Sequence, residues 1–116
     1  MTTPLREPTF LLLTALARRP LHGYGLITEV AELSEGRITL RPGTLYGALD
    51  RLTDDGLVAH DHEEVVDGRL RRYYRLTDEG LNVLGAETER MRRNLKAATA
   101  RLKASGWVAP RVGGIA

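Results

Sequence analysis

The sequence predicts a small, mainly helical α+β domain in which three helices precede a two-stranded β-ribbon and a long final helix. A length of 116 residues allows one domain. Only 5% of the residues are aromatic, so the core must consist of aliphatic residues, a composition that favours helices. The dipeptide Asp67-Gly68 stands between two strand-like runs and is typical of a tight hairpin. An apolar content of 42% excludes a disordered chain.

The spacing of apolar residues predicts the first two helices. The segment from Pro8 to Ala17 is apolar on every side, as in a helix that its neighbours bury. A second helix is predicted over His22 to Ser34, because its apolar residues recur at helical spacing. Glu35 and Gly36 end this helix, and Arg37 to Leu40 is expected to be extended.

A third helix is predicted to begin at Pro42 and to end before Gly56. Its core stripe is Leu45, Leu49 and Leu52, with Ala48 beside it. The opposite face carries small and polar residues, namely Gly43, Thr44, Tyr46, Gly47, Asp50 and Arg51. The helix's own stripe does not pack this face, which leaves it free for a partner.

Two strands follow, Leu57 to Val65 and Leu70 to Leu76. The acidic residues of this ribbon come first, at positions 61, 63, 64 and 67, and four arginines follow, at 69, 71, 72 and 75. Alternation along a strand puts Arg72 on the opposite face from Arg69 and Arg71. The neighbouring tyrosines must also face opposite ways, and we expect Tyr73 to be the one in the core.

The final helix is predicted from a cap at Thr77 to about Ala104, with Gly106 after its end. Its apolar stripe follows alternate steps of three and four residues, as in a coiled coil, and indicates a dimer interface. The residues of this stripe are Leu81, Leu84, Thr88, Met91, Leu95, Ala98 and Leu102. We therefore predict a division into residues 1–76, a dimerisation helix over 77–105 and a flexible tail over 106–116.

Three helices followed by a ribbon form a winged helix-turn-helix, in which the third helix fits the DNA major groove. Four motifs add a family resemblance. They are His22-Gly23-Tyr24-Gly25, Pro42-Gly43-Thr44-Leu45-Tyr46, Leu49 to Leu52 with Asp55-Gly56-Leu57-Val58, and Arg72-Tyr73-Tyr74-Arg75-Leu76-Thr77-Asp78-Glu79-Gly80. In this order and spacing, over roughly Leu5 to Leu102, the chain resembles the PadR family of transcriptional regulators. The single terminal helix resembles the short-helix branch of that family.

This resemblance implies a homodimeric transcriptional repressor that binds double-stranded DNA at an inverted repeat. Its third helix would read bases and its wing would touch the backbone or the minor groove. The expected DNA-binding residues are His22, Tyr24, Gly43, Thr44, Tyr46, Gly47, Arg51, Arg69, Arg71 and Arg72. The ring of Tyr46 could instead pack inward, and His22 and Tyr24 could serve as capping and packing residues.

Two departures favour an alternative, a winged-helix module that binds protein and does not read DNA. Gly47 stands where the family usually has proline, which loosens the exposed first turn of the reading helix by ~1 kcal/mol. The acidic run from Asp61 to Glu64 would repel phosphate if it faced DNA.

The remaining expectations concern ligands and location. Some members of the family release DNA when a small molecule binds, so an aromatic or hydrophobic effector is one expected partner, and Trp107 is the candidate ligand-binding residue. His60, His62 and Glu64 are expected to align on one face of a strand, but this exposed row is too short to predict a metal site. No catalytic constellation and no cofactor motif is present. The absence of cysteine and of a long apolar run predicts a cytoplasmic protein without a membrane span.

Overall fold

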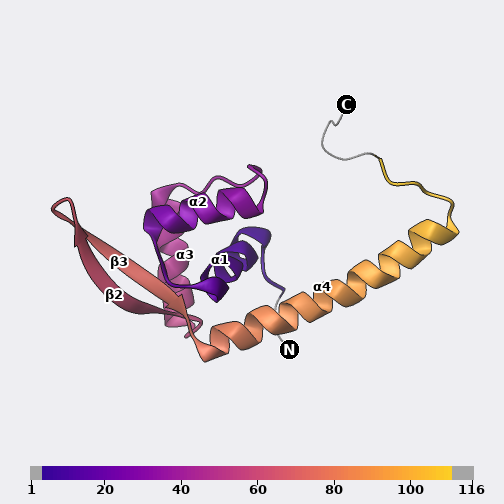
Figure 1. The fold of residues 1–116 in the computed structure, drawn as a ribbon. Coiled ribbons are helices and arrows are strands. Elements are labelled where there is room, and N and C mark those ends of the chain that lie inside the picture. Colours follow the sequence, from indigo (N-terminus) through magenta and orange to yellow (C-terminus); the bar gives the residue numbers. More distant parts are fainter. Residues whose placement is uncertain (1–3, 111–116) are drawn as a thin grey trace.

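Three helices share one apolar core, and the β-ribbon and the final helix leave that core in different directions (Figure 1). The computed structural model describes residues 4–110. Over these residues the helices are α1 (Glu7–Arg18), α2 (Gly23–Leu33), α3 (Pro42–Asp54) and α4 (Asp78–Ala104), and the strands are β1 (Leu21–His22), β2 (Val58–Val66) and β3 (Arg69–Leu76). The mainly helical winged helix-turn-helix fold that the sequence predicts is confirmed. None of these helices is long and apolar enough to cross a membrane.

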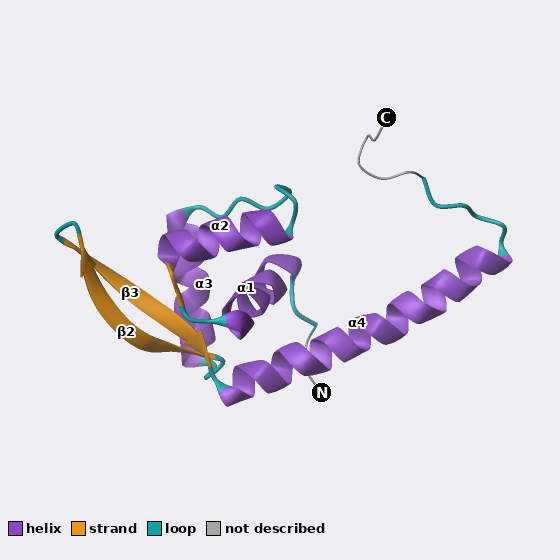
Figure 2. Cartoon of the chain, in the orientation of Figure 1, coloured by secondary structure: helices purple, strands orange, loops and turns teal. Residues whose placement is uncertain are grey.

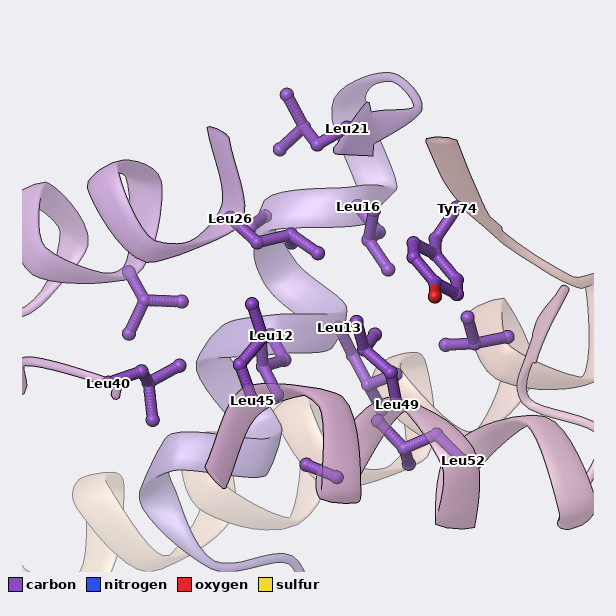
Figure 3. Close-up of a cluster of buried hydrophobic side chains, with 14 residues drawn as sticks. Leu12, Leu13, Leu16, Leu21, Leu26, Leu40, Leu45, Leu49, Leu52 and Tyr74 are labelled. Carbon is purple, nitrogen blue, oxygen red and sulfur yellow. The ribbon is translucent and has the colours of Figure 1, made fainter. Parts of the chain in front are cut away.

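Leucines from all three N-terminal helices form the core (Figure 3). Leu13 from α1, Leu26 from α2 and Leu49 from α3 are fully buried. Leu40, at the end of the predicted extended segment, is also buried against this core. The apolar stripes that the sequence shows for α2 and α3 therefore pack together with the apolar helix α1, and the opposite face of α3 remains outside.

Tyr74, and not Tyr73, is the tyrosine of the core, so that prediction is wrong. Tyr74 is only 4% exposed and points among the leucines (Figure 3). Tyr73 is partly exposed. Residues 70, 72, 74 and 76 share one face of β3, and this face carries Leu76, which packs against the core. The face of Tyr73 carries arginines at 69, 71 and 75, of which Arg69 and Arg75 are exposed and Arg71 is partly exposed. Tyr74 lies two residues before the apolar Leu76 and therefore on the same face of the strand. This spacing is the sequence signal that indicates Tyr74 as the buried tyrosine.

The sheet has a third strand in addition to the predicted two-stranded wing. Leu21 pairs with Tyr74 and His22 pairs with Tyr73, so the order of the strands is β1-β3-β2. His22 therefore lies in β1 and at the N-cap of α2, and the helix begins one residue later than predicted. Two residues are too few to show the alternation by which a strand is found in a sequence.

A β-bulge at Asp61 changes the faces of β2. His60 pairs with Tyr74 and His62 pairs with Tyr73, and the register shifts between these two pairs. Because adjacent tyrosines of β3 face opposite ways, His60 and His62 lie on opposite faces of the sheet. The expected row of His60, His62 and Glu64 on one face is therefore wrong.

Helix α4 packs on the domain along its first half only. Its cap is as predicted, since the Thr77 hydroxyl accepts a hydrogen bond from the Gly80 N–H at 3.0 Å. Glu87 is buried, and its carboxylate accepts hydrogen bonds from the Leu5 N–H at 2.7 Å and from Arg90. From Arg92 to the end of the helix every residue is exposed, and this half extends past the domain (Figure 2). Of the predicted flexible tail, residues 111–116 lie outside the described residues.

Candidate nucleic-acid interface

The outward face of α3 is the first part of the candidate interface. Leu45, Ala48, Leu49 and Leu52 bury one side of this helix. With 3.6 residues per turn, the side directly opposite carries Gly43, Gly47, Asp50 and Asp54, while Thr44 and Arg51 lie on one flank and Tyr46 on the other. Gly43, Thr44 and Arg51 are exposed, and Gly47 is partly exposed beside the Arg51 guanidinium. The predicted residues of this helix are therefore presented together to solvent.

Tyr46, for which the sequence left DNA contact and inward packing open, packs against α2 and also remains accessible. Tyr46 is 46% exposed. Its hydroxyl also lies so close to the buried Gly23 that a Cβ atom there would collide with it. This contact ties the middle of α3 to the first turn of α2, so the tyrosine has a packing role as well as an exposed edge.

A hollow of about 620 Å³ separates the ribbon from the helices. Its helical wall includes His22, Tyr24 and Tyr46. Its other wall comes from the tip of the ribbon and includes the predicted arginines at 69, 71 and 72. The fold thus brings six of the ten predicted residues around one concavity, while Gly43, Thr44, Gly47 and Arg51 lie outside its lining, on the rest of the α3 surface.

The arginines of the ribbon differ in their partners. The Arg72 Nε atom lies 3.2 Å from a Glu63 carboxylate oxygen, and the Arg75 Nε atom lies 3.8 Å from an Asp61 oxygen. Arg69 and Arg71 form no ion pair with any residue in the described range 4–110. Strand β2 places Val66 opposite Arg69, and Glu64, opposite Arg71, contacts His62 instead. The two arginines near the hairpin therefore carry charge that the described part of the chain does not pair.

Much of the charge of the acidic run is paired within the ribbon. The His62 ring lies between two carboxylates, with Nδ1 at 2.5 Å from Asp61 and Nε2 at 3.2 Å from Glu64. The Asp61 carboxylate, and then that of Glu64, raises the pKa of His62. The ion pairs that Arg72 and Arg75 form, together with His62 when its ring is protonated, weaken the repulsion of phosphate that the sequence led us to expect.

An aromatic row crosses the sheet on the face of Tyr73. The Tyr73 ring stacks on His62 with ring centroids 4.3 Å apart, and it contacts His22 at 5.2 Å. Burial lowers the pKa of His22, and the nearby Arg71 charge lowers it further. His22, expected at DNA, thus also packs on the sheet and links β1 to the ribbon.

The predicted dimer stripe runs from the domain into solvent. Leu84 packs against the core of its own chain, and Met91 is partly buried. Leu81, Leu95 and Leu102 are 49%, 67% and 41% exposed, and Thr88 and Ala98 are exposed as well. Trp107 follows the end of α4, is 51% exposed, and donates its backbone N–H to the Leu102 carbonyl at 3.2 Å.

Residues 12–86, about two thirds of the chain, match the model of a protein family described as "Transcriptional regulator PadR-like family". The chain belongs to this family. The match includes β1, α2, α3, the whole ribbon and the first turns of α4. The family resemblance that the sequence motifs indicated is therefore confirmed.

Individual transcriptional regulators are also similar to this chain. The transcriptional regulator Rv3488 of Mycobacterium tuberculosis is 45% identical over 64 residues, which are 55% of this chain and 56% of that protein. A PadR-like transcription factor of Bacteroides fragilis is 30% identical with a TM-score of 0.64, covering 81% of this chain and 87% of its own. Bacillus subtilis PadR, solved in complex with operator DNA, is 23% identical with a TM-score of 0.61, over 70% and 46% of the two chains, and shows the shared fold.

Proposed function

We propose that this PadR-family chain is a sequence-specific DNA-binding transcriptional repressor that acts as a homodimer on an inverted repeat. The observation that carries the proposal is the uncovered face of α3 next to a ribbon whose Arg69 and Arg71 have no ion-pair partner in the described chain. A major groove admits one helix, and a guanidinium binds phosphate through two N–H donors. The operator complex of Bacillus subtilis PadR supports the same use of this fold.

In the proposed complex the helix and the ribbon have different tasks. Thr44, Tyr46 and Arg51 would approach base edges or nearby phosphates, with Gly43 and Gly47 allowing the helix backbone to come close. Arg69 and Arg71 would bind the sugar-phosphate backbone or enter the minor groove. His22 and Tyr24 lie at the start of α2, where free backbone N–H groups favour a phosphate.

The homodimer is proposed to form through α4. Every residue of its second half, from Arg92 onward, is exposed, and this half presents Leu95 and Leu102 on the line that begins with Leu81. A partner helix would cover this line from Leu81 to Leu102. Two-fold symmetry then places the two α3 helices on half-sites whose centres are about one helical turn, ~10 base pairs, apart.

An aromatic or hydrophobic effector between the two α4 helices would change the separation of the α3 helices and release DNA. The exposed Trp107 supports this part of the proposal, because an indole near the end of α4 offers a stacking surface. Titration of the dimer with a panel of aromatic compounds tests it by Trp107 fluorescence. The absence of any spectral change across the panel would contradict an aromatic effector.

Selection from random duplex DNA is the first test of the function. We expect the enriched sequence to be palindromic, because each protomer would bind one half-site. Fluorescence anisotropy with the enriched duplex and a scrambled duplex, each at two salt concentrations, then measures specificity. Equal affinity for both duplexes would contradict sequence-specific binding and favour a protein-binding module, for which the exposed acidic residues of β2 are the supporting observation.

Replacement of Arg69 and Arg71 by alanine tests the ribbon. If each arginine binds one phosphate, the dimer loses four contacts, and the slope of log K against log salt becomes less steep by about 3.6, since each phosphate contact contributes about 0.9. The matched control replaces Arg101 and Lys103, which also removes two positive charges but lies at the far end of α4. An unchanged slope in the ribbon variant, or an equal change in the control, would exclude these arginines as phosphate contacts.

A further inference from the structure

Asp50 holds a central position on the outward face of α3. Its line on the helix, opposite the buried leucines, begins with Gly43 and Gly47, which have no side chains. Asp50 comes next and is exposed. It is therefore the first side chain that projects along the middle of the face that we propose for the major groove. The sequence showed Asp50 on this face but did not assign it a contact.

The Asp50 carboxylate has no ion-pair partner among the described residues. Arg72 lines the same hollow of about 410 Å³ between α3 and β3, together with Tyr46, Leu70 and Tyr74. The Arg72 guanidinium is nevertheless paired with Glu63, at 3.2 Å. Asp50 is exposed to solvent, so its carboxylate is accessible to a partner outside the chain.

A carboxylate has few acceptable partners in a DNA groove. It accepts hydrogen bonds and donates none, so phosphate oxygens and the base acceptors of guanine and thymine repel it. The donors in the major groove are the amino groups at cytosine N4 and adenine N6, and aspartate pairs with the cytosine amino group. A negative side chain in the middle of the reading helix is thus tolerated only where the sequence presents an amino group.

We infer that Asp50 determines specificity by accepting a hydrogen bond from the amino group of a cytosine in each half-site. The inference rests on the proposed DNA-binding function and adds to it the identity of one base. Because the dimer is symmetric, the cytosine occurs twice in the operator, at equivalent positions. Guanine or thymine at this position weakens binding by about tenfold, and adenine, which also has an amino group, by less.

The test repeats the selection from random duplexes with wild type, Asp50→Ala and Asp50→Asn. For Asp50→Ala we expect a palindrome of the same length in which one position of each half-site accepts all four bases. For Asp50→Asn we expect adenine at that position, because an amide both donates to and accepts from adenine. Glu32→Ala is the control, since it removes an exposed negative charge from the end of α2 and should leave the selected sequence unchanged.

Anisotropy with duplexes that differ only at this position gives the magnitude. Wild type should prefer cytosine over guanine or thymine about tenfold, and Asp50→Ala should bind these duplexes equally. If Asp50→Ala binds every duplex more tightly by one common factor and selects the wild-type sequence, Asp50 only repels phosphate and the inference is wrong. If wild type itself selects no sequence, the proposed function fails together with the inference. Circular dichroism checks folding, and the isosteric Asp50→Asn provides a second variant.

Discussion

Tyr73 lies between two histidines whose pKa values shift in opposite directions. His62 stacks on one side of the ring and is held by Asp61 and Glu64, so its pKa is raised. His22 contacts the same ring from β1, and its pKa is lowered by burial and by Arg71. Protonation therefore strengthens the contacts of one histidine of this row and weakens those of the other.

Replacement of His62 by glutamine should remove a contribution to stability that exists only at low pH. Because the folded-state pKa of His62 lies above its ordinary value of 6.5, this contribution is complete below pH 6.5 and is lost as the pH rises through the raised pKa. The difference in unfolding free energy between wild type and the variant should thus shrink from about pH 5 to about pH 8. Urea unfolding at a series of pH values measures it.

His22→Gln is the internal comparison for this measurement. The folded-state pKa of His22 lies below 6.5, so the contribution of its neutral ring is present above pH 6.5 and is lost as the pH falls. The stability difference between wild type and this variant should change with pH in the opposite direction. If the two stability differences change with pH in the same direction, the pKa values of His22 and His62 are not shifted in opposite directions.

At the scale of elements, the start of α4 is tied to the turn between α3 and β2 through very close contacts. The Thr77 hydroxyl donates to the Gly56 carbonyl at 2.6 Å, and the Thr77 N–H donates to the Leu57 carbonyl at 3.1 Å. Gly80 packs so closely on the Leu57 carbonyl oxygen that a Cβ atom would collide with this backbone atom. The absence of a side chain at Gly80 therefore allows α4 to begin where it does.

Gly80→Ala should destabilise the domain by about 1 to 3 kcal/mol, because the backbone of Leu57 must move to admit the methyl group. Gly85→Ala is a matched control in the same helix. A Cβ at Gly85 meets no atom within 4 Å, so this variant should gain about 0.4 to 1 kcal/mol from reduced freedom of the unfolded chain. Urea unfolding compares the two. Equal changes in unfolding free energy for the two variants would show that the contact of Gly80 with Leu57 does not affect stability.

At the scale of the whole molecule, α4 gives the protein its elongated form, with principal extents of 58 × 42 × 22 Å (Figure 1). The apolar line that packs on α1 in the first half of α4 continues through Leu95 and Leu102 after the domain has ended. An exposed apolar line of this kind is typical of a helix that pairs with a second helix. The shape of one protomer thus supports the proposed dimer.

Leu95→Glu combined with Leu102→Glu should convert the proposed dimer into a folded monomer. These side chains are 67% and 41% exposed in one protomer, so their replacement affects the interface much more than the fold. Ala97→Glu with Ala100→Glu adds the same two charges on the opposite side of α4 and should leave the dimer intact. Light scattering gives the mass of each variant. A wild-type monomer at high micromolar concentration, or a dimeric leucine variant, would contradict the role of this line.

Features that depend on neighbours along the chain were predictable from the sequence. The core stripe of α3, the hairpin at Asp67-Gly68 and the cap at Thr77 each arise from the geometry of one helix, turn or helix end, and all are confirmed. The order of these elements, together with the motifs, was enough to predict the winged helix and the PadR family.

The tertiary structure alone decided which side chains meet. Strand β1 forms because Leu21 and His22 pair with Tyr74 and Tyr73 of β3. The bulge at Asp61 turns His62 to the face opposite His60. Ion pairs then engage Arg72 and leave Arg69 and Arg71 without a partner in the described chain. These outcomes depend on pairing and register between segments far apart in the sequence, whereas helix and strand periodicity is a local property of the backbone.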